Sequence, residues 1–103
     1  MAWHDVCDLA GLREGITPHR IGTQALLLVR DGDAVHAVDT LCPHKFGPLE
    51  DGDVEDGCIV CPLHDAGFRL TDGAPRDGDA WAGTLPIHPA RVVDGRVEVQ
   101  TAE

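Results

Sequence analysis

The stretch LCPHKFGPLEDGDVEDGCIVCPLH, residues 41–64, contains two short segments that each combine a cysteine with a histidine. They are Cys42-Pro-His44 and Cys61-Pro-Leu-His64. The short spacing lets a thiolate and an imidazole turn toward one point from a single tight loop, which the proline stiffens by fixing its φ angle. The sequence therefore predicts one metal site held by two neighbouring loops. Its four ligands are Cys42, His44, Cys61 and His64.

Two metals suit a set of two cysteines and two histidines. A single tetrahedral zinc ion is one of them, but zinc sites usually place both cysteines in one loop and both histidines in the other. Here each loop contains one of each, which favours a [2Fe–2S] cluster with both cysteines on one iron and both histidines on the other. A Cys-x-x-Cys pair of Cys58 with Cys61 would leave His64 without a role, so we rank it lower.

The sequence on both sides of this stretch is typical of a small β-framework. The chain has twelve glycines and seven prolines, and short β-type runs lie between them. Asp31-Gly32 and Asp94-Gly95 favour tight hairpins because glycine accepts positive φ. The expected strands are 25–30, 34–39, 58–61, 85–93 and 96–100, and one helical turn is expected at 8–12, capped by Asp8. We predict an all-β sandwich or barrel with residues 41–73 inserted as a cluster-binding subdomain.

These residues resemble the Rieske family motif, in which C-x-H is followed by C-x-x-H after a comparable spacer. The resemblance covers most of the chain and includes His64-Asp-Ala-Gly-Phe68, Thr71-Asp-Gly73 and the closing Val-Val-Asp-Gly-x-Val-x-Val segment. It implies a Rieske-like β-framework and one [2Fe–2S] cluster per chain. It also implies that the ligand histidines lie at the tip of the molecule, where electrons enter and leave.

Departures from the family's high-potential branch predict a low reduction potential. That branch has two extra cysteines, where this chain has Gly47 and Leu63, and a serine and a tyrosine, where this chain has Ala66 and Phe68. Neither of the latter side chains can donate a hydrogen bond to cluster or ligand sulfur. Loss of such donors destabilises the electron-rich reduced state, so we expect a potential toward the lower end of the Rieske range of about −150 to +300 mV.

Composition excludes several other classes. The 103 residues suffice for a single domain, 1–103, and the longest apolar run, 25–29, is far too short to span a membrane. A formal charge of −10 disfavours nucleic acid and anionic membranes as partners. The N-terminus has no export-type pattern, so the four cysteines point to metal binding in the cytoplasm rather than to disulfides.

The resemblance implies an electron carrier without catalytic turnover of its own. We expect the ferredoxin component of a ring-hydroxylating oxygenase system, with a flavoprotein reductase and a terminal oxygenase as partners. The alternatives are the small subunit of an assimilatory nitrite reductase, which shares the fold, and, below it, a structural zinc-binding interaction domain. The acidic run Glu50–Asp56 is either a solvated turn or a docking surface for a basic partner.

Overall fold

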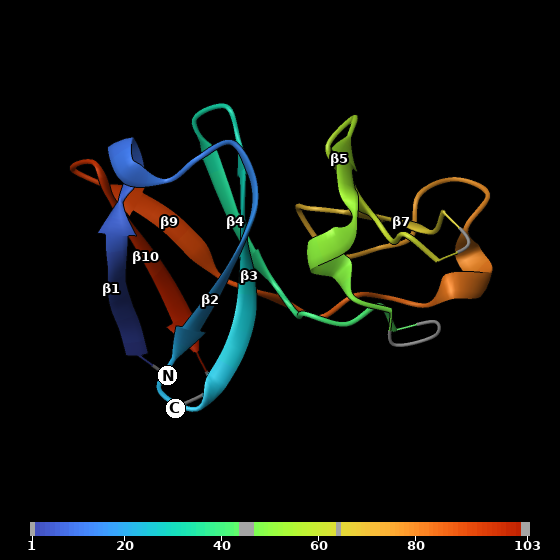
Figure 1. Cartoon of the computed structure of the whole chain (residues 1–103), viewed down its shortest axis with the longest axis horizontal. Coiled ribbons are helices and arrows are strands. Elements are labelled where there is room, and N and C mark those ends of the chain that lie inside the picture. Colours follow the sequence, from blue (N-terminus) through green and yellow to red (C-terminus); the bar gives the residue numbers. More distant parts are fainter. Residues whose placement is uncertain (1, 44–46, 64, 102–103) are drawn as a thin grey trace.

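Three antiparallel sheets lie side by side in the described part of the chain, residues 2–43, 47–63 and 65–101 of this computed structural model (Figure 1). One sheet has the order β1-β10-β9, the second β2-β3-β4-β8 and the third β5-β6-β7. The strands are β1 (Ala2–Asp8), β2 (Gly15–Ile21), β3 (Gln24–Asp31), β4 (Ala34–Val38), β5 (Asp53–Glu55), β6 (Cys58–Val60), β7 (Gly67–Arg69), β8 (Ile87–His88), β9 (Ala90–Val93) and β10 (Arg96–Thr101). The 3₁₀ turns are η1 (Leu9–Gly11), η2 (Leu49–Asp51) and η3 (Ala80–Ala82).

The expected all-β fold is confirmed, with the stretch that contains the candidate ligands inserted between β4 and β8. We call the first two sheets the framework and residues 39–86 the insert. The insert extends beyond the expected boundary at 73 because the chain after β7 packs back on it. Pro75 forms a β-bridge with Phe68, and the N–H of Arg76 donates to the carbonyl of Gly67 at 2.9 Å.

Strand β3 connects the framework to the insert because both of its faces are buried. Leu26 and Leu28 pack with Val97 and Val99 of β10 in the core of the framework. Leu27 and Val29 point the other way and share a core with the ligand-loop cysteines and the rest of the insert. Side chains that alternate along β3 therefore belong to two different cores. The core of the insert, which contains Cys42 and Cys61, includes one face of this framework strand.

Two-residue turns at Asp94-Gly95 and Asp56-Gly57 connect neighbouring strands, whereas the turn expected at Asp31-Gly32 lies one residue later, at Gly32 and Asp33, because Asp31 pairs with Ala34. Asp94 and Gly95 both have positive φ (51° and 76°), as tight turns of this kind require. Asp56 and Gly57 (49° and 77°) form the same turn between β5 and β6, a hairpin signal that the sequence interpretation had not used. This turn builds the sheet of the insert.

Two local expectations differ from the structure. The run 85–93 is divided into β8 and β9 at Pro89, whose ring nitrogen has no hydrogen to donate to a sheet. The turn at 8–12 is 3₁₀, and Asp8 does not cap it, since its carboxylate accepts a hydrogen bond from Arg96 Nη1 at 2.7 Å. Within the described residues, no helix is long and apolar enough to cross a membrane.

Candidate metal centre

Each of the two cysteine loops is closed by its own backbone hydrogen bond, and the two bonds are equivalent. The N–H of Cys42 donates to the carbonyl oxygen of Gly47 at 2.9 Å, and the N–H of Cys61 donates to that of Ala66 at 2.7 Å. Each bond joins a cysteine to the fifth residue after it, so each ligand segment is a short loop with its ends held together. His44 and His64 belong to these loops but lie outside the described residues.

Paired backbone segments present both loops from the insert. Leu41 and Pro48 form a β-bridge across the base of the first loop, and the N–H of Leu49 donates to Thr40 at 3.0 Å just outside it. The second loop connects β6 to β7, where Val60 pairs with Gly67. The structure thus confirms that the two segments are hairpin-like loops.

The side chains of Cys42 and Cys61 meet in the core of the insert. Both are fully buried (0% exposed) and belong to one cluster of packed side chains, where the Cys42 thiol acts on the pKa of Cys61. Burial raises the pKa of the Cys61 thiol, the backbone N–H of Leu63 lowers it, and the Cys42 thiol raises it again. A metal ion bound to both sulfurs would replace their protons and stabilise the thiolates, so this donor pair fits one iron of a cluster.

Gly47 brings the first loop against the sulfur of the second. A Cβ atom added there would lie 3.1 Å from Cys61 Sγ and 2.8 Å from Leu63 Cδ1, so no side chain fits without displacing a neighbour. This close approach is what a site shared by two loops requires. Gly47 and Leu63 are also the places where the high-potential branch has its extra cysteines. Gly47 and Leu63 are neighbours in this structure, and neither residue has a thiol with which to form a disulfide.

Ala66 and Phe68 are fully buried in the same core as the two ligand cysteines. The Ala66 carbonyl closes the second loop, and the Phe68 ring is among the largest buried side chains. Neither offers a hydroxyl group. The two residues that the sequence predicted to offer no hydrogen bond therefore lie in the same apolar core as the sulfurs of Cys42 and Cys61.

Cys58 points away from the ligand pair. Along β6, Cys58 and Val60 face one side of the sheet, and continuation of the alternation puts Cys61 on the same side as Ile59. Ile59 and Cys61 accordingly belong to the core that contains Cys42, and Cys58 does not. The structure therefore does not bring the side chains of Cys58 and Cys61 together on one side of the sheet. Cys7 lies in β1 of the framework.

The remaining histidines all lie in framework strands, as expected of residues outside the site. His4 contacts Thr101 Oγ1 at 3.0 Å, and His88 pairs with Asp39 at 2.9 Å. Burial lowers the pKa of His36 in β4, and His19 lines a surface groove beside β2. Among the described residues, no group of three or more His, Cys, Asp or Glu side chains is placed to hold a metal ion.

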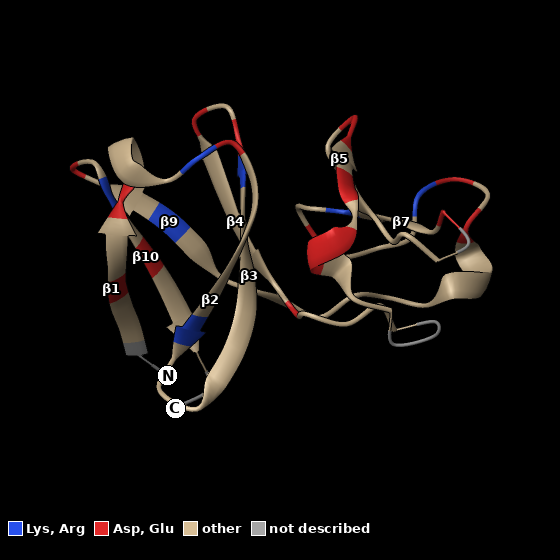
Figure 2. Ribbon diagram, viewed as in Figure 1, with Lys and Arg blue, Asp and Glu red and all other residues tan. Residues whose placement is uncertain are grey.

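The acidic run 50–56 lies along η2 and β5, beside the framework (Figure 2). Glu50 and Asp53 line a groove of about 380 Å³ whose framework side contributes Glu14 and Asp31. Asp51, which follows the first ligand loop, is exposed. Three large apolar side chains of the insert are also exposed: Leu41 before the first cysteine loop (48%), Leu63 of the second cysteine loop (43%) and Trp81 of η3 (52%).

Sequence reasoning missed Arg76 and Asp79, whose side chains contact the backbone of the second ligand loop and of β7. Both residues lie in a stretch rich in glycine and charge that has no recognisable motif. The spacing of an arginine and an aspartate three residues apart was the only available signal, and such pairs are common on surfaces.

Comparison with known proteins matches this chain to one family model and to similar curated proteins. A family model described as Rieske [2Fe-2S] domain matches residues 2–89. Among curated proteins, the anthranilate 1,2-dioxygenase ferredoxin subunit of Burkholderia cepacia is 35% identical over 98 residues, which cover 94% of this chain and 90% of that protein.

Solved structures with the same fold include proteins of two kinds. A chain in the complex of reduced oxygenase and oxidized ferredoxin in carbazole 1,9a-dioxygenase superimposes with a TM-score of 0.79 at 27% identity, covering 94% of this chain and 91% of that chain. A structure described as an NADH-dependent nitrite reductase small subunit from Mycobacterium tuberculosis has a TM-score of 0.83 at 27% identity, covering 99% and 97%.

Proposed function

This chain belongs to the Rieske [2Fe–2S] domain family, and on that basis we propose that it holds its cluster through Cys42, His44, Cys61 and His64. The observation that carries the proposal is the meeting of Cys42 and Cys61, two buried thiols presented by matching loops from one core. The described donors fit two thiolate ligands on one iron, and the sequence places one histidine in each loop for the other.

A bound cluster would supply a centre that accepts and releases one electron. The residues of this chain give that centre a fixed and dry environment. The closed loops hold the ligand backbone, the buried side chains around both sulfurs exclude water, and the apolar Ala66 and Phe68 withhold hydrogen bonds that would favour the reduced state.

The function best supported is that of an electron carrier, the ferredoxin component of a ring-hydroxylating oxygenase system. The relative from B. cepacia, which is matched over nearly its whole length, is the ferredoxin subunit of such a dioxygenase. The partners would be a flavoprotein reductase that donates electrons and a terminal oxygenase that receives them. The chain itself would turn over no organic substrate.

One observation favours a second candidate. The fold superimposes as well on a nitrite reductase small subunit as on a ferredoxin from an oxygenase system. A small subunit of this kind would work beside a sirohaem-containing large subunit. Genes for oxygenase subunits next to this one would favour the first candidate, and a gene for the large subunit would favour the second.

Spectra of the purified holoprotein and a reconstituted electron relay test the proposal. We expect a brown protein with about two irons and two sulfides per chain and, once reduced, a paramagnetic signal with a low average g-value. Reduced protein should transfer its electron to a ring-hydroxylating oxygenase and support product formation. A colourless protein with stoichiometric zinc would refute the cluster. A loaded protein that no oxygenase oxidises would refute only the ferredoxin role.

The cytoplasm is the compartment that we propose for this protein. All four cysteines are free, including Cys7 and Cys58, which lie outside the ligand pair. Thiols of this kind persist in a reducing environment, whereas oxidising compartments favour disulfides. Cell fractionation with detection of the cluster protein in the membrane-free cytoplasmic fraction would support this location, and recovery from the periplasm would contradict it.

Reversal of one acidic charge should test whether the run 50–56 steers a basic partner. Asp51→Lys places a positive charge directly after the first ligand loop. We expect reduction by a basic reductase to slow about threefold at low salt and to recover at high salt, because screening removes long-range attraction. Stopped-flow reduction at several ionic strengths measures the effect.

Asp33→Lys is the matched control, since Asp33 is exposed in the turn between β3 and β4 of the framework. This variant has the same change in net charge. Equal slowing of the two variants would indicate a general effect of net charge, and unchanged rates would leave the acidic run with a role in solubility only.

Restoring the missing hydroxyl groups should raise the reduction potential. Ala66→Ser and Phe68→Tyr each add a donor where the high-potential branch has one. A hydrogen bond that is stronger by about 1.4 kcal/mol in the reduced state corresponds to roughly +60 mV for one electron. Redox titration by protein-film voltammetry measures the shift.

Ala37→Ser serves as the control for this change. Ala37 is a buried alanine in the core of the framework, away from the ligand loops. The same added hydroxyl there should leave the potential unchanged. If neither Ala66→Ser nor Phe68→Tyr raised the potential above that control, the explanation of the low potential by missing donors would be wrong.

A further inference from the structure

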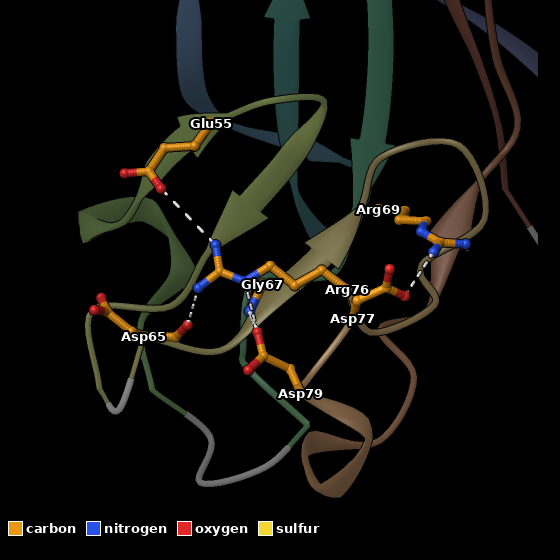
Figure 3. Close-up of polar contacts among 7 residues, drawn as sticks. All are labelled: Glu55, Asp65, Gly67, Arg69, Arg76, Asp77 and Asp79. Carbon is orange, nitrogen blue, oxygen red and sulfur yellow. Dashed lines mark hydrogen bonds and ion pairs between the residues drawn. The ribbon is translucent and has the colours of Figure 1, made fainter.

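We propose that Arg76 is the positioning residue of the second ligand loop, an inference that rests on the proposed cluster site. Its guanidinium Nη2 donates a hydrogen bond to the carbonyl oxygen of Asp65 at 2.6 Å (Figure 3). Asp65 immediately follows the expected ligand His64, and its own side chain takes no part in this contact. Arg76 therefore holds the backbone one residue away from a ligand.

The guanidinium group is held in place by two further partners. Arg76 Nε donates to Asp79 Oδ2 at 2.6 Å, and Nη1 lies 3.8 Å from Glu55 Oε2, at the end of β5. Each nitrogen thus has its own acceptor or counter-ion, on β5, in the ligand loop and in the segment before η3. Only the planar fork of an arginine can satisfy three such directions at once.

Asp79 also ties Arg76 to the start of β7. The same oxygen, Oδ2, accepts a hydrogen bond from the backbone N–H of Gly67 at 3.0 Å. This N–H lowers the pKa of the Asp79 carboxyl, and the hydrogen bond from Arg76 lowers it further. Donation of this hydrogen bond to Asp79 in turn raises the pKa of Arg76. Both groups therefore stay charged, so the contact persists at every pH at which the protein works.

Gly67 allows the arginine to lie flat against the loop. A Cβ atom added at Gly67 would lie 2.6 Å from Arg76 Nε and would also overlap Cδ of the arginine stem. A side chain at this position would push the guanidinium away from the Asp65 carbonyl and from the Asp79 carboxylate. The glycine thus has a specific function here, which is to let the positioning residue approach.

The backbone that Arg76 holds is in an unusual conformation. Asp65 has φ = 58°, in the left-handed region that L-residues rarely adopt. This residue turns the chain from the ligand segment back toward β7, and the bond from Arg76 stabilises the turn through the Asp65 carbonyl. Without that bond the turn at Asp65 would relax more readily, and the backbone that follows the expected ligand position would be held less firmly.

Substitution of Arg76 tests the inference on the intact holoprotein. Arg76→Gln removes the fork, and Arg76→Lys keeps the positive charge and most of the stem but not the three-way geometry. We expect the iron affinity of both variants to fall roughly 10–100-fold, the usual effect of removing a group that orients a metal ligand, so that a chelator removes their iron faster than it does from the wild type. We also expect the g-values of the reduced cluster to shift, because these depend on how the ligand histidines are oriented.

Arg69→Gln is the matched control, since Arg69 belongs to the same insert and its side chain only pairs with the exposed Asp77 at 3.5 Å (Figure 3). Its change in charge is identical to that of Arg76→Gln. Thermal unfolding of each purified holoprotein measures whether the variant still folds. If Arg76→Gln does not fold, Arg76→Lys, which retains the stem over Gly67, carries the test.

The outcomes separate the two proposals. Fast iron release and altered g-values in the Arg76 variants, with Arg69→Gln like the wild type, support the inference. Equal rates and spectra for the Arg76 and Arg69 variants overturn it and leave the cluster assignment intact. A wild-type protein that binds no cluster overturns the proposed function and this inference with it.

Discussion

Cys42→Ser and Cys61→Ser proteins are expected to be colourless, with visible absorbance below about a tenth of the wild-type value per chain. Each substitution replaces a sulfur of the buried pair with a hydroxyl that stays protonated at neutral pH and is a poor ligand for iron. Loss of either sulfur would leave one iron with a single thiolate. Visible absorption, iron analysis and the reduced-state paramagnetic signal measure the loss.

Cys58→Ser is the control for this prediction, because it removes a buried cysteine that lies outside the proposed ligand pair. Cys58 is buried three residues before Cys61, but it faces the opposite side of β6. The variant should keep the full cluster content, and so should Cys7→Ser in the framework. If Cys58→Ser were as colourless as Cys61→Ser, Cys58 would be a ligand, and the assignment of Cys42 with Cys61 would be wrong.

Gly73→Ala should have the next largest effect, on stability. Gly73 has φ = +76°, and its backbone packs against the backbone of Leu85, whose N–H donates to the Gly73 carbonyl at 2.9 Å. An added Cβ would overlap the Leu85 carbonyl oxygen and lie 3.0 Å from its carbon, so the backbone must move. Left-handed strain and overpacking together should cost about 2–5 kcal/mol of unfolding free energy.

Gly95→Ala separates the two causes of this loss. Gly95 has the same φ of +76° in the turn between β9 and β10, but nothing lies within 4 Å of an added Cβ. It should therefore show the conformational strain alone, about 1–2 kcal/mol. Urea denaturation of both variants measures the difference. Equal losses would show that the close contact of Gly73 with Leu85 is not important for stability.

Sequence reasoning was most accurate where hydrophobic runs end at glycine turns. The expected strands 25–30, 34–39 and 96–100 correspond to β3, β4 and β10 with ends within one residue. In these segments the apolar side chains and the adjacent turn residues indicate the same structure, and burial on both faces explains the unbroken apolar run of β3.

Edge strands were missed because their own residues give a weak signal. Strand β2 contains Pro18, which argues against a central strand, and it lies at the edge of its sheet. Strand β1 pairs with β10 from the opposite end of the chain, and Arg96 binds the carboxylates of Asp5 and Asp8 across that pair. Strand β1 forms because a partner distant in sequence offers it hydrogen bonds, and β2 forms because the strongly apolar β3 that follows it pairs with it.

Four candidate ligands of two types, two cysteines and two histidines at characteristic offsets, were enough to predict the kind of site, because chemistry at a metal depends on which donors are available. The same sequence also showed that the donors of the high-potential branch are missing at positions 66 and 68. These inferences are local: they depend on residue types and short spacings, which can be read along the chain.

Folding in three dimensions settled the relations between distant segments. It placed Cys42 beside Cys61 and turned Cys58 away, set Gly47 against the ligand sulfur, and brought Arg76 to the carbonyl of Asp65. These contacts depend on strand alternation, hairpin register and the packing of the insert on β3. A one-residue change in the pairing register of β6 would put Cys58 toward the core and turn Cys61 away from it. Residue spacing along the chain does not show which of these two registers forms.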